Sequence, residues 1–144
     1  MNKIKYSNNV NSDIYQDSIN IRKAVFIDEQ NVPKNLEIDD NEANCTYFNL
    51  YVDNQPVATA RFFPTEDNGI HVQRVAVLKN FRHQNLGSNL LKNIIKFAQK
   101  NNYKYVILGA QDHAQLFYKK LGFHVVGNQY QEVGILHHDM KLDL

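Results

Sequence analysis

Apolar residues recur along the chain with a spacing that changes from one segment to the next. Alternating or continuous apolar runs predict strands at residues 3–6, 46–52, 57–63, 70–78, 105–108, 123–126 and 135–142. Apolar residues three and four positions apart predict helices at about residues 12–29, 86–100 and 114–121. The stretch 30–44, which holds Pro33 and several acidic residues, is predicted to be a loop.

The order of these elements predicts one α+β domain over residues 1–144, with a mixed, mostly antiparallel sheet and helices on both faces. A chain of 144 residues with 43% apolar and 22% charged residues can bury a core of ordinary size. The 16 basic residues barely exceed the 15 acidic ones, so no nucleic-acid partner is expected.

No apolar run approaches the roughly 20 residues of a membrane span, and the first residues lack the apolar core of a signal peptide. Cys45 is the only cysteine, which argues against a disulfide framework and a cysteine-based zinc site. His137 and His138 are neighbours on a predicted strand and therefore point to opposite faces, so no metal site is expected. These features predict a cytoplasmic protein without a membrane partner.

Residues 74–92 carry the most informative chemistry of the sequence. The apolar run Val75–Leu78 is followed by a basic turn, and Leu86-Gly87-Ser88 then opens an amphipathic helix. A strand that delivers a polar, glycine-containing turn onto a helix N-terminus can bind phosphates through main-chain N–H groups. The turn lacks the nucleoside-triphosphate pattern GxxxxGK[ST] and the dinucleotide pattern GxGxxG, so a different pyrophosphate ligand is predicted.

Residues 82–88, RHQNLGS, resemble the coenzyme A pyrophosphate loop [RQ]xxGx[GA] of the GCN5-related N-acetyltransferase (GNAT) family. Asn85 replaces the first glycine of that pattern, and asparagine is the best substitute for a left-handed backbone conformation. Residues 108–123 resemble the family's AxxxAxxFYxxxGF segment. Residues 22–39 and 130–137 resemble blocks of its ElaA/YjcF-like subfamily, with Leu136 in place of proline.

The resemblance implies that acetyl-CoA binds where the strand ending near Leu78 splays from the strand ending near Gly109. The main chain of the first strand would pair with the pantetheine arm. The residues expected to contact the coenzyme are Val75, Ala76, Val77, Arg82, His83, Gln84, Asn85, Leu86, Gly87, Ser88, Gln111, Ala114, Phe117 and Tyr118. The implied reaction is direct attack of a primary amine, on an unidentified small molecule or peptide, on the thioester.

The resemblance further implies that Tyr118 is the general acid that protonates the leaving thiolate, although an aromatic residue at this helical spacing could equally serve only the core. Candidates for the general base or acceptor contacts are Glu37, Glu132 and His137. The acceptor itself is expected to meet Phe26, Glu29, Gln30 and Asp39.

The remaining polar residues have simpler interpretations. Asp40 and Glu42 are expected to lie on a solvated loop face, His71 at the surface, and Arg74 at a strand edge.

Two alternatives to an N-acetyltransferase remain open. One is a regulatory module that binds acyl-CoA without turnover. The other is an acyltransferase resembling acyl-homoserine-lactone synthases, against which stands the lack of tryptophan. A homodimer is compatible with the family, and no residue pattern argues for one.

Overall fold

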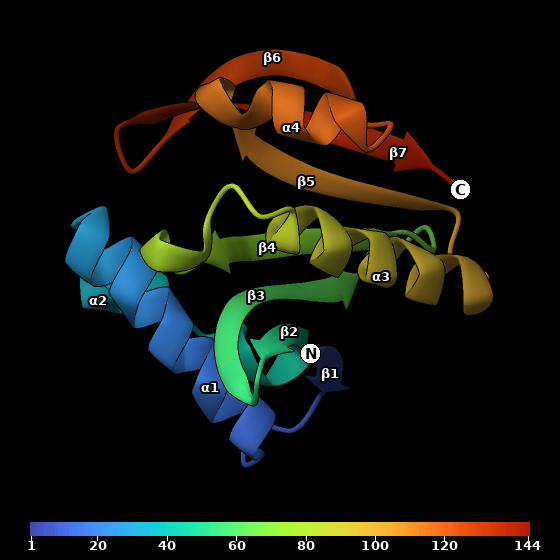
Figure 1. Ribbon diagram of the computed structural model, residues 1–144. Helices are drawn as coiled ribbons and strands as arrows, with labels where there is room; N and C mark the ends of the chain where they lie inside the picture. The colour runs from blue at the N-terminus through green and yellow to red at the C-terminus, as the bar shows by residue number, and fades with distance from the viewer.

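A single seven-stranded sheet runs through the molecule in the order β1-β2-β3-β4-β5-β7-β6. The computed structural model describes all 144 residues (Figure 1). All neighbouring strands are antiparallel except β4 and β5, which are parallel. The strands are β1 (Asn2–Ser7), β2 (Thr46–Val52), β3 (Gln55–Pro64), β4 (Ile70–Val77), β5 (Tyr105–Gln111), β6 (His124–Glu132) and β7 (Ile135–Asp143). The mixed, mostly antiparallel sheet predicted from the sequence is confirmed.

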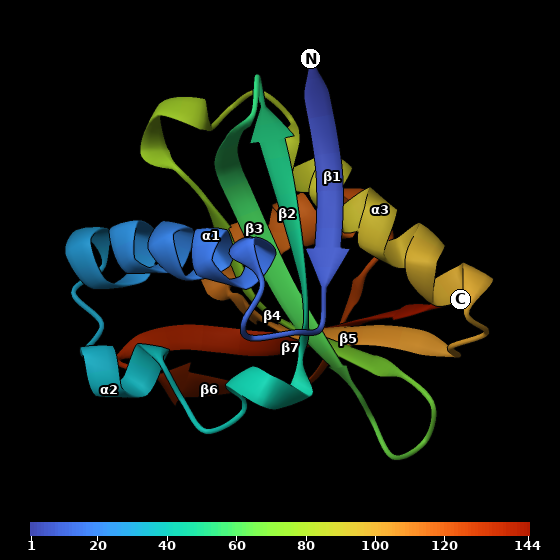
Figure 2. The ribbon, with the colours of Figure 1, turned by 90° about the horizontal axis from the view of Figure 1, so that it is seen from below.

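Helices cover both faces of this sheet. On one face α1 packs against β2 and β3; on the other, α3 packs against β2, β3 and β4, and α4 lies on β5 (Figures 1 and 2). The helices are α1 (Asp13–Arg22), α2 (Lys34–Glu37), α3 (Leu86–Lys100) and α4 (Gln115–Lys120). Short helical turns are η1 (Lys23–Glu29), η2 (Glu42–Asn44), η3 (Lys79–Phe81) and η4 (Asp112–Ala114).

The main core lies between the sheet and the helices α3 and α4. The apolar side of α3, with Leu90, Leu91, Ile94 and Ala98, is fully buried there, as its spacing in the sequence predicted. Burying such side chains against a sheet is the dominant favourable term for a helix of this length. The α3 helix therefore holds the loop that precedes it in a fixed place on the sheet.

The structure departs from the predicted elements around the first helix. The predicted helix 12–29 becomes α-helical only to Arg22 and continues as the π-helical segment η1, in which the N–H of Gln30 donates to the carbonyl of Val25. The predicted loop 30–44 contains the short helix α2 and the turn η2. A π-helical turn is wider than an α-helical one, and such turns occur frequently at functional sites.

A buried network of three arginines and three carboxylates fixes residues 34–44 to the sheet. Arg22 on α1 and Arg61 on β3 have no exposed surface. Arg22 Nε donates to Glu37 Oε2 at 2.8 Å, and its Nη1 donates to Glu42 Oε1 at 2.7 Å. Arg61 donates to Glu42 Oε2 at 2.9 Å and to Asp39 Oδ2 at 2.8 Å.

Arg74 on β4 completes this network. Its Nε lies 3.1 Å from Glu37 Oε2, and its Nη2 lies 3.3 Å from Asp39 Oδ2. The prediction that Glu42 is solvated is therefore wrong, because this carboxylate lies between Arg22 and Arg61. Burial would raise the pKa of Glu42, but hydrogen bonds from Arg22 and from the N–H of Asp39 hold that pKa well below its ordinary value. Arg74, expected at a strand edge, does lie where β4 has no partner on its β5 side, and it also pairs with Glu37 and Asp39.

Replacing Arg22 with methionine should strongly destabilise the fold. The substitution leaves Glu37 and Glu42 partly unpaired inside the protein, and removing one partner of a buried ion pair typically costs about 3–5 kcal/mol. Urea unfolding of Arg22→Met against the wild type measures this loss. Lys92→Met, at an exposed lysine of α3, is the matched control. A loss below about 1 kcal/mol, the range of exposed ion pairs, would show that the network contributes little.

Candidate active site

The central strands β4 and β5 separate before either of them ends. Only Ile70–Val72 pair with Val106–Leu108, although β4 continues to Val77 and β5 to Gln111. The two strands diverge toward the end of β4 (Figure 1). Beyond Val72, the edge of β4 that faces β5 therefore has no partner strand. An extended ligand can bind such an edge by main-chain hydrogen bonds, as an added strand does.

A β-bulge in β4 lies next to this separation. Thr59 pairs with Ala76 and Arg61 with Gln73, so that Ala60 of β3 faces both Arg74 and Val75. Arg74 has a φ of +57°, an uncommon value for a residue with a side chain. Bulges bend the strand that carries the extra residue and increase its twist. The bulge therefore accounts for the turning of β4 away from β5.

The bulge also changes which residues of β4 face each layer of helices. Val72 packs in the main core with α3, and beyond the bulge Val75 and Val77 pack there too. Ala76 instead packs with Ile21 and Val25 of the first helix. The side chains of Val75, Ala76 and Val77 thus serve the two apolar clusters, as expected, while the main chain of the same residues lies at the open edge.

The loop between β4 and α3 ends in a row of free main-chain amides. His83 and Asn85 both have positive φ, +64° and +61°, and α3 begins at Leu86. The expected left-handed conformation of Asn85 is confirmed. The first helical hydrogen bond runs from the N–H of Asn89 to the carbonyl of Asn85 at 3.0 Å, and the amides of residues 83–88 donate to no group of the chain. Such amides, at the positive end of the helix dipole, favour an anion.

Gly87 lets the start of α3 lie close to its neighbours. A Cβ atom on Gly87 would lie 3.3 Å from Val77 Cγ2 and 3.5 Å from Phe117 Cζ. A branched side chain at this position would press on both residues. The glycine therefore keeps the helix N-terminus close to the open end of β4.

Arg82 is engaged by protein groups. Its Nε donates to the carbonyl of Val77 at 3.0 Å, and its two Nη atoms contact the carboxylate of Glu29 at 2.5 and 2.7 Å. The hydrogen bond from Arg82 lowers the pKa of Glu29. Arg82 thus ties the end of β4 to η1, and brings Glu29, which was expected on the acceptor side, to the predicted phosphate loop.

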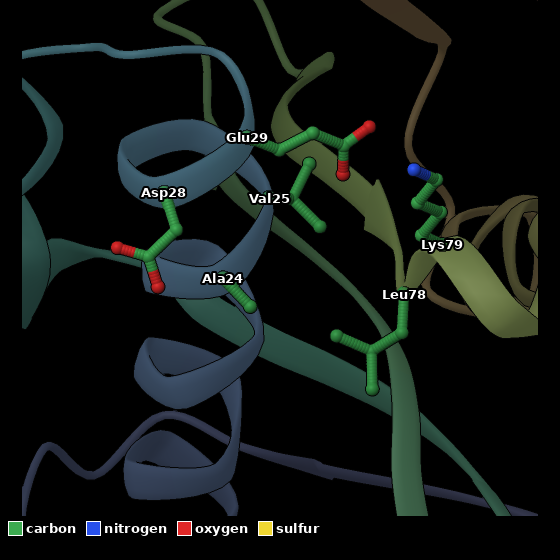
Figure 3. A pocket seen from close by; sticks show the side chains of 6 residues that line it. All are labelled: Ala24, Val25, Asp28, Glu29, Leu78 and Lys79. Carbon is green, nitrogen blue, oxygen red and sulfur yellow. The ribbon is translucent and has the colours of Figure 1, made fainter.

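A cavity of about 250 Å³ lies between η1 and the end of β4. Figure 3 shows Asp28 and Glu29 on one wall and Leu78 and Lys79 on the other, with Val25 between them. Of the other expected acceptor contacts, Phe26 packs beside Val25, whereas Gln30 is exposed. Glu37 and Asp39 are engaged by the buried arginines and therefore do not offer free charge to a cationic ligand.

Tyr118 of α4 lies in the core beside the separation of the strands. It is 8% exposed and packs edge-on against Phe117 and Phe123. Its hydroxyl makes no hydrogen bond within the chain, and burial raises its pKa above the ordinary value, so the phenol stays protonated. Gln111 and Ala114, also expected near the coenzyme, lie at the end of β5 and in η4, just ahead of α4.

The opposite face of the sheet carries a cluster of aromatic and titratable side chains. Tyr130 of β6 donates to Asp139 Oδ1 at 2.8 Å and stacks on His137 of β7. His137 Nδ1 lies 2.8 Å from the carbonyl of Ile135 and donates to it, and Nε2 has no partner within the chain. Glu132, by contrast, is exposed at the end of β6.

Sequence reasoning missed His71 of β4. It is half-buried against Phe63, with ring centroids 5.0 Å apart, and the burial lowers its pKa. The prediction that it lies at the surface is therefore wrong. The sequence did indicate this burial, because Ile70 and Val72 flank His71 in a strand and both face the core. His71 must then point to the other face of the sheet.

No helix of the chain is long and apolar enough to cross a membrane. A family model described as an acetyltransferase (GNAT) domain matches residues 10–144. The chain is 33% identical over 134 residues to an uncharacterized N-acetyltransferase of Bacillus subtilis, YjcF, with 92% of this chain and 95% of the relative covered. It is 32% identical over 130 residues to the protein ElaA of Escherichia coli, with 88% and 85% covered.

Solved structures agree with these relationships. The crystal structure of Escherichia coli ElaA has a TM-score of 0.85 at 27% identity and covers 98% of this chain and 99% of its own. A GNAT family acetyltransferase from Elizabethkingia anophelis, crystallised with acetyl-CoA bound, shares the fold with a TM-score of 0.73 at 21% identity, covering 99% of this chain and 98% of its own. The protein belongs to the GNAT family of acetyltransferases, in the branch that contains YjcF and ElaA.

Proposed function

We propose that the protein is an acetyl-CoA-dependent N-acetyltransferase that acts on a primary amine. One observation carries the proposal: β4 separates from β5 after Val72, and the loop that follows β4 has free amides at residues 83–88. An open strand edge that leads into an anion-binding helix N-terminus suits a ligand with an extended arm and a pyrophosphate. Acetyl-CoA has both parts, and the acetyl-CoA complex of the Elizabethkingia relative supports this choice.

The residues present fit such a coenzyme. The free amides of the loop would hold the pyrophosphate, with Gly87 leaving room for close approach. The main chain of Val75 and Val77 would hold the pantetheine arm, and its thioester would supply the activated acetyl group. Catalysis would come mainly from holding the amine against that thioester.

Tyr118 would act as the general acid. Its hydroxyl has no partner within the chain and stays protonated because burial raises its pKa. A protonated phenol next to the thioester can donate its proton to the departing thiolate. Its packing between Phe117 and Phe123 fixes the direction of the ring.

Replacing Tyr118 with phenylalanine should lower the turnover number by at least about tenfold, because only the proton donor is lost. The measurement is release of free thiol from acetyl-CoA with a panel of primary amines, together with the Kd for coenzyme. The Kd should stay nearly unchanged, since the ring remains. Unchanged turnover in Tyr118→Phe would eliminate this tyrosine as the acid.

We propose His71 as the general base, because it is half-buried and lies on β4 just ahead of the separation from β5. Direct attack needs a neutral amine, and the burial that lowers the pKa of His71 keeps the imidazole neutral and able to accept a proton. It lies on the face of the sheet opposite Tyr118, so that acid and base would approach the thioester from two sides. His137, with Nε2 free, lies on the same face as His71 and is better suited to orient the amine.

The pH dependence of kcat/KM tests His71. The neutral form exists above its pKa, which is lowered, so activity should be flat near pH 7 and fall as the pH drops through a value below about 6.5. His71→Gln should remove this limb and lower kcat/KM about 100-fold. His124→Gln, at an exposed histidine of β6, is the control and should retain both the acidic limb of the pH profile and the wild-type kcat/KM. A limb that persists in His71→Gln would assign the base to another group.

The alternative of a regulatory module that binds acyl-CoA without turnover gives a different result in the same assay. It predicts coenzyme binding that depends on the 83–88 loop, with no thiol release for any amine. The pKa shift of His71 and the unpartnered hydroxyl of Tyr118 favour the enzyme, because a binding module requires neither.

A further inference from the structure

A second groove lies far from the separation of β4 and β5, at the β1 edge of the sheet. It has a volume of about 430 Å³ and is formed by β1, β2 and α3. Figure 2 shows β1 at the edge of the sheet beside α3. The lining residues are Ile4, Tyr6, Phe48, Asn93, Lys96, Phe97, Lys100 and Asn101. Its volume falls in the range of small-molecule sites, roughly 300–1,000 Å³.

Aromatic rings form the apolar part of this groove. Tyr6 stacks on Phe48 with ring centroids 4.9 Å apart and an interplanar angle of 12°. Phe97 meets both rings edge-on, at 5.3 and 5.5 Å. Tyr6 is nonetheless 56% exposed, so part of this ring surface is open to a ligand. A fixed group of rings with one open member is suited to a planar aromatic ligand.

The charge beside these rings is positive and unbalanced. Lys92, Lys96 and Lys100 follow one another at four-residue spacing along α3, and none of them forms an ion pair. No acidic residue occurs between Asp67 and Asp112, a stretch with seven lysines and arginines. Like charges four residues apart destabilise a helix by a few tenths of a kcal/mol. At the C-terminus of α3, the favourable interaction of Lys100 with the helix dipole offsets this repulsion. Lys92 and Lys96 lie too far from that end to gain the same interaction.

The two asparagines of the groove offer acceptors. The side-chain N–H groups of Asn93 and Asn101 donate to main-chain carbonyls of α3, at 3.0 Å to Asn89 and 2.8 Å to Phe97. Their amide oxygens accept no hydrogen bond within the chain. The groove therefore combines open aromatic surface, two free ammonium groups and two free acceptors.

We propose that this groove binds a small aromatic anion: a planar ring that packs on Tyr6 and Phe97, with a phosphate or carboxylate held by Lys96 and Lys100. Nucleoside monophosphates and aryl carboxylates share this chemistry. The site lies at the opposite end of α3 from the 83–88 loop, and its occupancy does not depend on the proposed transferase reaction.

Calorimetric titration with phenyl phosphate tests the proposal, with saturating acetyl-CoA present so that the coenzyme site is filled. Binding with a Kd of about 1 mM or tighter is expected, and inorganic phosphate and phenol alone should each bind at least about tenfold more weakly. Titrations with AMP and with benzoate, under the same conditions, distinguish a nucleotide ligand from an aryl carboxylate.

Variants locate the binding. Tyr6→Ala and the double variant Lys96→Gln/Lys100→Gln should each weaken phenyl phosphate binding at least about fivefold. The double variant Lys34→Gln/Lys104→Gln removes the same charge at exposed positions elsewhere and should bind as the wild type does. Failure of the wild type to bind any of the aromatic anions, or equal affinity in all variants, would overturn the proposal.

Sedimentation at increasing protein concentration checks the competing occupant, a second copy of the chain pairing through the open edge of β1. The proposal expects the same oligomeric state for the wild type and Tyr6→Ala. A dimer that is lost in Tyr6→Ala would show that the groove is a subunit interface, and this result would also overturn the proposal of a small-molecule site.

Discussion

Two residues of β4, Arg74 and Val75, lie opposite the single residue Ala60 of β3, and this bulge shapes the candidate site. The extra residue bends β4 away from β5 and opens the edge at which we propose that the coenzyme binds. It also forces Arg74 into a left-handed conformation, which costs a residue with a side chain about 1–2 kcal/mol. Contacts of Arg74 with Glu37 and Asp39 offset this cost.

The buried charges therefore serve the site indirectly. Arg22, Arg61 and Arg74 hold residues 34–44 against the sheet and, at the same time, hold the bulge in place from one side. The aliphatic core with α3 holds β4 from the other side. Between these two supports, β4 stays paired with β3 along one edge, while its other edge is open beyond Val72. This arrangement lets a ligand bind the main chain without first having to order it.

Much of the fold could be predicted because apolar spacing reports which face of each element is buried. The sequence of α3 showed both its helical spacing and the left-handed cap at Asn85. Partners far apart in the chain could not be predicted. Arg22 lies beside buried apolar residues of α1, a position that demands an acidic partner, yet nothing in the sequence indicates which of the acids in residues 34–44 supplies it. Glu42 was therefore assigned to solvent. The burial of His71 could have been inferred from the core residues Ile70 and Val72 on either side of it, but its packing partner Phe63 of β3 could not.

We infer that a diphosphate binds the free amides of residues 83–88 while an extended arm binds the open edge of β4. Hydrogen exchange of the backbone amides, with and without acetyl-CoA, measures both contacts in one experiment. Exchange should become slower in residues 83–88 and in Val75–Val77 when the coenzyme is added, and no such change should occur in Gly87→Val. Unchanged exchange in both segments, in a protein that still releases thiol from acetyl-CoA, would contradict this inference.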